Sequence, residues 1–450
     1  MKKIYKELEE FSGFFPNISF FLSSHFISYF FSFFIIIFLA RQYSADLFGK
    51  FTVAQTIFFI IYSISFSNIH YYLNKSLSLK FHDRKKNIAS CFLITFYSSV
   101  ALYILLLIIV AILDIDSDLK NTIILINLIL LSQPFAIFHS ELFVRGQFYT
   151  IFKTRFLQNL IFFPIKFMII FFKFDIGYLA LAYFFENLFF SVCMIYYFIK
   201  NGNSFKKLII SKIHILKIFK KIILFPLLAL SFLVSLRIDI LMISTLLDEE
   251  SSGYYSAATR IITIILLFGT HFFQFIYPNL NRINNKKEKF IKIYNRIILL
   301  SLLVGFLCFL MSIIFGSFYL NLYGEKFLVA LNSLIILSIN ISFALLINAW
   351  IYKNYINAKY KTILFFQASA ITINILLNYY LVSNFGIDGA AMATVISGLI
   401  SFLIVNIYQP NEFAIILSSF TSDKIKAATK DMLRIILTKK NPDKDEKIND

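Results

Sequence analysis

The sequence predicts an all-α integral membrane protein. The chain of 450 residues has a mean hydropathy of +0.76, with 59% hydrophobic and only 15% charged residues. Soluble domains carry about 25% charged residues, whereas a run of about 20 apolar residues is long enough to cross a bilayer. Such runs recur along this chain. Because lipid offers no hydrogen-bond partners to the backbone, these runs must be helices.

The apolar runs predict about twelve membrane spans. They cover residues 14–40, 51–73, 88–113, 121–140, 156–173, 177–199, 222–247, 254–280, 293–320, 327–352, 361–383 and 386–408. The first run is too long for the apolar region of a signal peptide and no A-x-A-like site follows it. Each of the three cysteines lies inside a span, so the sequence predicts no disulfide framework.

The basic residues predict the orientation of the spans. Of the 43 Lys and Arg residues, 35 lie before the first span, after the even-numbered spans or in the tail. Five lie on the other side: Arg41, Lys50, Lys120, Lys173 and Lys326. The positive-inside rule therefore puts both termini in the cytoplasm. The net charge of +18 is explained as an orientation signal, and no nucleic-acid partner is expected.

The connections on the outer side are short, which disfavours an enzyme with a large extracytoplasmic domain. No Walker A loop, metal-ligand spacing or nucleophile–base arrangement is present in the sequence. We therefore expect no enzyme, no bound metal and no cofactor. A channel, a transporter or a scaffold remains.

Three pairs of motifs predict a duplicated six-helix unit. "FGKFTVAQT" (48–56) and "SGYYSAATR" (252–260) place Gly49 and Gly253 204 residues apart. "FKTRFLQ" (152–158) and "YKTILFFQ" (360–367) share an aromatic-Lys-Thr sequence, and Gly177 and Gly389 both open a span. Because six spans return the chain to its starting side, the two units are expected to be parallel lobes around a central cavity.

The predicted domains follow from this duplication. Residues 1–199 form an N-lobe with spans one to six, and residues 222–408 form a C-lobe with spans seven to twelve. Residues 200–221 form a cytoplasmic interfacial linker helix, because 203–221 mixes Lys with Ile and Leu at helical spacing. Residues 409–450 form a cytoplasmic tail with an amphipathic stretch at 423–440 and a charged end. A cationic face resting on anionic lipid is the favoured explanation of both stretches, with a partner-binding site as the alternative.

A few ionisable residues inside the spans are the candidate functional residues. A charge inside a membrane is costly, so each is a functional hypothesis. Asp239 and Arg260 lie at similar depth and could pair, as could Lys166 and Glu186. Either pair could be purely structural, and Lys166 could instead extend to the membrane surface.

Arg237 lies close to the midplane, and these pairings leave it without an ionic partner. Arg237 and Asp239 are two residues apart, about 200° around a helix axis, so they cannot pair face to face. We therefore expect Arg237 to face a water-filled cavity that receives an anion, because a guanidinium binds phosphate through two hydrogen bonds.

Three segments carry a family resemblance. "FLARQYSADLFGKFTVAQTI" (38–57), "RIDILMISTLLDEESSGYYSAATRI" (237–261) and "FGIDGAAMATVISGLISFLI" (385–404) resemble the polysaccharide-repeat-unit (O-antigen) flippases of the multidrug/oligosaccharidyl-lipid/polysaccharide (MOP) exporter superfamily. The resemblance extends from about residue 10 to 408. Arg41, Asp239 and Arg260 match motif positions of the family.

The resemblance implies a bundle of two six-helix lobes in the bacterial inner membrane that flips undecaprenyl-diphosphate-linked oligosaccharide to the periplasmic leaflet for O-antigen, lipopolysaccharide or capsule assembly. Arg260 and Arg41, which match the motifs, would bind the substrate together with Arg237 and Lys166, which are inferred from their positions inside the spans. Asp239, from the motifs, and Glu186, from its position, would serve in ion pairs or in coupling to H⁺ or Na⁺.

Membrane lipids and the polysaccharide polymerase machinery are the other expected partners. The alternative is a cation-coupled multidrug exporter of the same fold, although such exporters typically carry an acidic residue in the first span. A passive scaffold for glycan-assembly enzymes is a third possibility.

Overall fold

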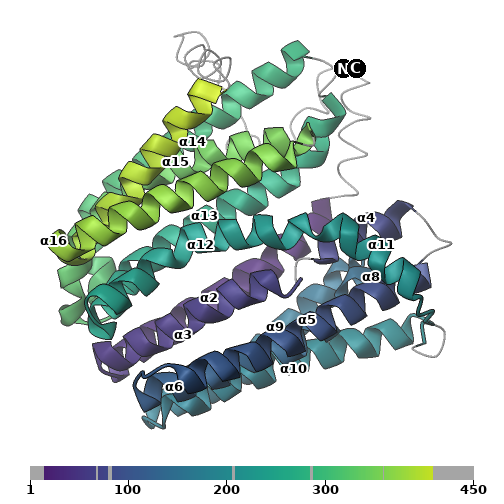
Figure 1. Cartoon of the computed structure of the whole chain (residues 1–450), viewed down its shortest axis with the longest axis horizontal. Coiled ribbons are helices and arrows are strands. Elements are labelled where there is room, and N and C mark those ends of the chain that lie inside the picture. The colour runs from purple at the N-terminus through teal and green to yellow at the C-terminus, as the bar shows by residue number, and fades with distance from the viewer. Residues whose placement is uncertain are drawn as a thin grey trace, which may run out of the picture. The chain divides into compact units, whose positions relative to one another are not determined.

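The computed structural model describes residues 15–66, 69–79, 84–204, 208–283, 287–357 and 359–408, and within these ranges the chain is helical with no β-strand. The N-terminal half contains α2 (Phe15–Gln42), α3 (Ala45–Ile64), α4 (His70–Leu79), α5 (Arg84–Ile112), α6 (Ser117–Asn127), α7 (Ile129–Ala136), α8 (His139–Val144), α9 (Phe148–Phe171) and α10 (Ile176–Lys200). The rest contains α11 (Lys212–Ile222), α12 (Leu224–Leu246), α13 (Glu249–Ile283), α14 (Lys287–Asn321), η3 (Glu325–Ala330), α15 (Leu331–Ile356) and α16 (Tyr360–Tyr408), as Figure 1 shows.

The predicted membrane character is confirmed for the described part of the chain, where nine helices are long and apolar enough to cross a bilayer. Each predicted span overlaps at least one helix. The second predicted span ends earlier than expected, because α3 stops at Ile64 and α4 begins anew at His70. The fourth is divided at Leu128, between α6 and α7. The tail at 409–450 lies outside the described residues.

Capping residues and left-handed residues explain where several helices begin and end. Ser44 caps α3 by accepting a hydrogen bond from the Leu47 N–H at 3.2 Å, and Asp175 caps α10 by accepting one from Gly177 at 2.6 Å. Gly386 has φ of 61° and ψ of −141°, which interrupts α16 and separates two apolar helical stretches. Only glycine adopts that backbone geometry at little cost.

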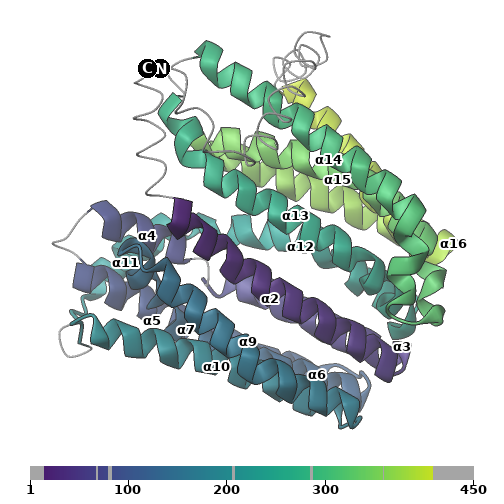
Figure 2. The same cartoon turned by 180° about the vertical axis from the view of Figure 1, so that it is seen from behind.

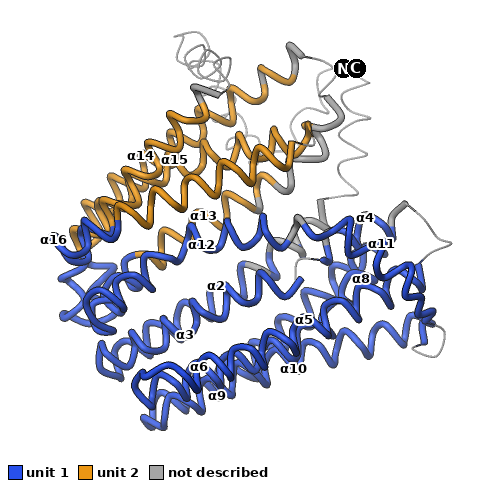
Figure 3. The backbone as a smooth tube through the Cα atoms, in the orientation of Figure 1, with its two compact units in different colours: residues 1–258, 318–330, 378–390 blue, residues 259–317, 331–377, 391–450 orange. Residues whose placement is uncertain are grey.

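Two compact units divide the described chain, coloured separately in Figure 3. Of the described residues, those within 1–258, 318–330 and 378–390 form unit 1, and those within 259–317, 331–377 and 391–450 form unit 2. In unit 1, α2 packs along α9, α3 packs along α12 and α6, and α10 packs against α6, α7 and α9. The helices α4, α8 and α11 gather at one end of unit 1, and α6 begins at the other (Figures 1 and 2).

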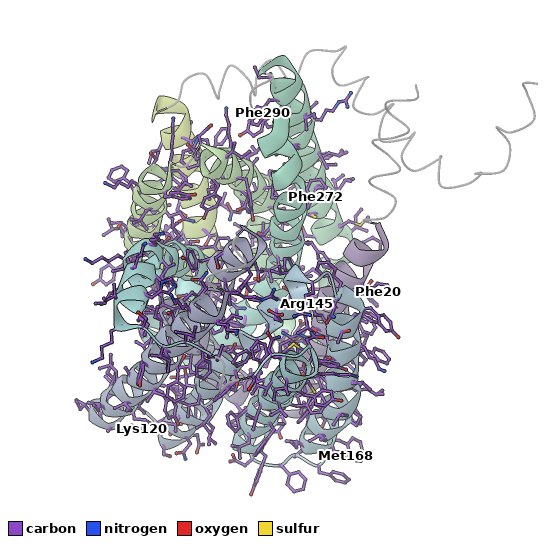
Figure 4. The ribbon with its side chains drawn as sticks, turned by 90° about the vertical axis from the view of Figure 1, so that its right-hand side faces the viewer. Phe20, Lys120, Arg145, Met168, Phe272 and Phe290 are labelled. Atoms are coloured by element: carbon purple, nitrogen blue, oxygen red, sulfur yellow. The ribbon has the colours of Figure 1, made fainter. Side chains whose placement is uncertain are left out.

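The end of unit 1 with α4, α8 and α11 has its own apolar core. Leu73, Cys91, Leu142, Phe198 and Ile218 are among its buried residues, and they come from α4, α5, α8, α10 and α11. Figure 4 labels Arg145 at this end, just after α8. The linker predicted at 203–221 therefore contains a helix, although a shorter one that begins at Lys212.

Unit 2 is held together by contacts among α13, α14, α15 and α16. Phe273, Tyr294 and Leu346 belong to one buried cluster from the first three of these helices. The Trp350 ring on α15 lies 4.8 Å from the Phe366 ring on α16. The twelve-span layout in two lobes, the lobe boundaries and the side of the termini stay predictions.

Candidate functional site

An ion pair lies in the interior of unit 1. The Lys166 Nζ on α9 donates a hydrogen bond of 2.8 Å to the Glu186 Oε2 on α10, and both residues are buried. The ammonium also lies 4.4 Å from the centre of the Tyr183 ring. The predicted pairing is therefore present. The alternative, in which Lys166 extends to the membrane surface, is wrong because its side chain is only 3% exposed.

A second cation belongs to the same cluster. The Arg155 guanidinium lies 3.5 Å from the centre of the Phe190 ring and donates to the Gln158 Oε1 at 3.0 Å. Gln158 in turn donates to the backbone oxygen of Glu186 at 3.0 Å. Arg155, Gln158, Lys166 and Glu186, named here the α9–α10 cluster, thus carry two positive charges and one negative charge. Such a cluster favours anionic ligands when its carboxylate is ionised and favours them more when it is protonated.

A buried carboxylate lies on α12 of the same unit. Asp239 is 5% exposed and accepts hydrogen bonds from the Tyr255 hydroxyl at 2.9 Å and from the Asn378 side-chain amide at 2.8 Å. These three side chains come from α12, α13 and α16. Arg260 lies in unit 2, so its pairing with Asp239 stays a prediction.

Arg237 has an aromatic neighbour that the sequence did not predict. Its guanidinium lies 4.9 Å from the centre of the Phe59 ring on α3, and the residue is half-buried. Arg237 therefore has an aromatic partner, and the expectation that it faces a water-filled cavity stays a prediction. A cation over an aromatic face is stabilised electrostatically and keeps hydrogen-bond donors at its edge. Because α3 packs along α12, Phe59 is held where it meets this side chain.

The two duplicated glycine motifs pack directly against each other within unit 1. A Cβ atom built on Gly49 would lie 1.7 Å from the Glu249 backbone oxygen, and one built on Gly253 would lie 2.6 Å from the Ala45 oxygen. Ala45 and Glu249 are also 204 residues apart. The hydroxyl groups of Thr52 and Ser256, again 204 apart, are joined by a hydrogen bond of 3.0 Å.

The contact is reciprocal, because Gly49 meets Glu249 while Gly253 meets Ala45, as in a local, approximate two-fold arrangement of the two segments. The contact joins the start of α3 to the start of α13, and we name it the glycine crossing. It brings two segments with matching sequences backbone to backbone, where no side chain fits between them.

Arg41 precedes the glycine crossing in the sequence, and its side chain contacts backbone carbonyl groups. Its side chain donates to the Leu322 oxygen at 2.6 Å and to the Asn321 oxygen at 3.1 Å. These carbonyls lie at the C-terminal end of α14, where helical carbonyls lack intrahelical partners. Lys326 Nζ donates to the Tyr43 oxygen at 2.9 Å, and the Tyr43 hydroxyl donates to the Phe174 oxygen. The turn between α2 and α3 therefore ties several helix ends of unit 1 together.

A polar cluster lies at the opposite end of unit 1. Glu141 accepts hydrogen bonds from Arg84 Nε at 3.1 Å, Arg145 Nε at 2.6 Å and Asn203 Nδ2 at 3.2 Å. Its side chain is 0% exposed. Burial alone would raise the pKa of Glu141, but the hydrogen bonds and charges of the two arginines outweigh it and lower the pKa below its usual value. This cluster joins the start of α5 to α8 and to the connection after α10.

Sequence reasoning missed several residues of these clusters for identifiable reasons. Arg155 lies among the basic residues that predict the orientation, although Gln158 and Asn159 follow it on one helix at spacings of three and four. Tyr255 lies inside the motif 252–260, but nothing in that motif marks its hydroxyl as a hydrogen-bond donor. Phe59 and Asn378 carry no local signal, because only packing brings them to Arg237 and Asp239.

The fold defines a class of protein, the multi-pass helical membrane proteins. The structure matches a lipid II flippase, MurJ, in an inward closed conformation, with a TM-score of 0.68, 17% identity, and coverage of 94% of this chain and 93% of the other. It matches a multidrug resistance MATE family transporter with a TM-score of 0.69, 11% identity, and coverage of 86% and 95%. A MOP superfamily transporter from Pyrococcus furiosus gives a TM-score of 0.65, 12% identity, and coverage of 89% and 94%.

The chain belongs to the polysaccharide biosynthesis protein family, whose model matches residues 14–284. The resemblance to the MOP superfamily drawn from the sequence motifs is thereby confirmed, and the fold is that of the superfamily. No curated protein sequence matches the chain closely enough to count as a relative.

Proposed function

We propose that this protein flips undecaprenyl-diphosphate-linked oligosaccharide repeat units from the cytoplasmic to the periplasmic leaflet of a bacterial inner membrane, for the assembly of a surface polysaccharide. The family match supports the polysaccharide pathway. The observation that carries the transport mechanism is the glycine crossing, because it joins two segments with matching sequences by a reciprocal contact.

Two segments with matching sequences that are in close contact at one end of unit 1 are consistent with transport by alternating access. In carriers built from repeats, substrate lies between the repeats and transport is a rocking of one against the other. The glycine crossing is then the closed side of the carrier. By the charge distribution of the connections, that side faces the periplasm, so the closed crossing corresponds to a state open to the cytoplasm.

The interior cations would bind the charged part of the substrate. A diphosphate carries negative charge at every physiological pH, and guanidinium groups bind it through paired hydrogen bonds. Arg237, held over Phe59, and Lys166 of the α9–α10 cluster are the groups in unit 1 that we assign to this role. Arg260 joins them by its motif position, and Arg41 is assigned to the closed end through its bonds to α14.

Glu186 and Asp239, two of the buried carboxylates of unit 1, are the candidates for coupling. Protonation of Glu186 would release Lys166 from its ion pair and raise the positive charge of the cluster. Protonation of Asp239 would weaken its bonds from Tyr255 and Asn378, which come from two other helices. Binding of H⁺, or of Na⁺ in its place, to either carboxylate would thereby be coupled to helix packing.

Deletion of the gene in its own host tests the proposal. The expected result is loss of the surface polysaccharide, with lipid-linked repeat units held on the cytoplasmic leaflet. Complementation with Arg237→Gln should restore less polysaccharide than Arg237→Lys, because only the latter keeps the charge. An unchanged surface glycan in the deletion strain would refute the proposal.

A cation-coupled multidrug exporter is the second candidate. The similarity to MATE transporters and the buried carboxylates of Glu186 and Asp239 favour it. It predicts increased sensitivity of the deletion strain to toxic organic cations, with the surface glycan intact. The same deletion strain therefore separates the two functions.

A further inference from the structure

The helix α11 has one face that is packed and one that is not. Ile218 and Ile222 are each 1% exposed and belong to the apolar core shared with α4, α5, α8 and α10. His214 is fixed on this side, because its Nε2 lies 2.7 Å from the Asn87 Oδ1 on α5. Ser211 caps the helix by accepting a hydrogen bond from the His214 N–H at 3.4 Å. The helix is therefore anchored in a fixed rotation.

The opposite face combines large apolar side chains with lysines. Ile213 is 81% and Leu216 is 60% exposed, and Lys212, Lys217 and Lys220 are exposed beside them. At 100° per residue, these five positions lie within about 140° of the helix circumference. The helix contains no acidic residue, so nothing on it neutralises the lysines.

The position of α11 along the bundle supplies an independent observation. Its partner Asn87 lies in the first turn of α5, directly after the charged residues Arg84, Lys85 and Lys86. Because α5 continues as an apolar membrane span to Ile112, its first turn marks the boundary between lipid headgroups and hydrocarbon. The exposed face of α11 therefore lies at the depth of the headgroups.

A face of this kind at this depth fits an anionic lipid surface. Apolar side chains enter the acyl boundary, while lysines extend along it and place their ammonium groups among the phosphates. A soluble acidic partner would match the lysines, but it would leave unexplained why Ile213 and Leu216 lie at the headgroup level.

We propose that the exposed face of α11 binds anionic phospholipid headgroups and holds the α4–α8–α11 end of unit 1 against the inner leaflet. This inference does not rest on the transported substrate. Each lysine near an anionic surface contributes roughly fivefold to affinity. Loss of three lysines should therefore remove most of the preference for anionic over zwitterionic lipid.

The test uses the full-length protein in nanodiscs of phosphatidylcholine, with and without phosphatidylglycerol. A variant with Lys212, Lys217 and Lys220 changed to Gln is compared with a matched variant in which the same three become Arg. Native mass spectrometry of the lipids retained by each protein measures the preference for phosphatidylglycerol. The expected result is a preference at least tenfold weaker in the Gln variant and unchanged in the Arg variant.

A second measurement reports where the face lies. A fluorophore attached at Ile213→Cys, with the native cysteines replaced, should be quenched by lipids that carry a nitroxide near the headgroup and protected from aqueous iodide. Equal lipid preference in the Gln and Arg variants would overturn the proposal. So would strong iodide quenching at residue 213 without lipid quenching, which would indicate a face open to water or to a soluble partner. Neither readout depends on flipping, so failure of the proposed function would be seen separately.

Discussion

The glycine crossing gives the sharpest prediction, because the structure sets how far its helices must move. In Gly49→Ala the new Cβ would lie 1.7 Å from the Glu249 oxygen, whereas ordinary contacts begin at 3.4 Å. The backbone of α3 and the start of α13 must therefore separate by about 1.7 Å. In Gly253→Ala the distance to the Ala45 oxygen is 2.6 Å, so a smaller separation of about 0.8 Å suffices.

Overpacking of this kind costs about 1–3 kcal/mol, and here the cost falls on the closed crossing alone. If the crossing opens during transport, the substitution shifts the population toward the open state by roughly 5–150-fold. We expect Gly49→Ala to have the larger effect and Gly253→Ala the smaller. Both should reduce the surface polysaccharide in a complementation assay, because a carrier must close on each side in turn.

The assay is cross-linking of Thr52→Cys with Ser256→Cys, whose native hydroxyls lie 3.0 Å apart. Gly269→Ala is the matched control, because it is also a glycine of α13 but its Cβ would meet only the flexible end of the Leu345 side chain, at 2.4 Å. Cross-linking should fall in Gly49→Ala and stay high in Gly269→Ala. Equal cross-linking in the two variants would refute the reasoning.

Three further predictions concern the charged clusters. Glu186→Gln leaves Lys166 buried without its counter-ion and should destabilise the protein by about 3–5 kcal/mol, whereas K166M/E186L should destabilise it much less. Unfolding in detergent measures both variants, and equal losses of stability would contradict the pairing argument. Glu141 has a lowered pKa, so its contribution to stability is present at neutral pH and should be lost as the pH falls through and below its usual pKa. Glu141→Gln should therefore flatten the pH dependence of stability, measured by thermal unfolding between pH 7 and pH 3. Asp239→Asn should keep the fold, since an amide oxygen can still accept a hydrogen bond, but it should abolish transport if this carboxylate couples to a cation. A full level of surface polysaccharide in that variant would show that Asp239 has no part in the mechanism.

The sequence was sufficient for the helical membrane class and for the approximate positions of the spans. Length and hydropathy decide both, because a span needs only about 20 apolar residues and lipid forces each run to be helical. The pairing of Lys166 with Glu186 was also predictable, since two charges at similar depth in neighbouring spans have few other partners. The motif pair at Gly49 and Gly253 predicted an internal repeat without any knowledge of the fold.

Only the tertiary structure decided which side chains meet. Phe59 reaches Arg237 because α3 packs along α12, and Asn378 reaches Asp239 from a helix 139 residues later in the chain. Nothing local in the sequence marks such partners, because other apolar or amide side chains at these positions would be equally compatible with the helix that carries them. The sequence determined that Gly49 and Gly253 correspond, from their shared motif. Their direct contact depended on the crossing of two helices, where a backbone oxygen occupies the space that a Cβ atom would need.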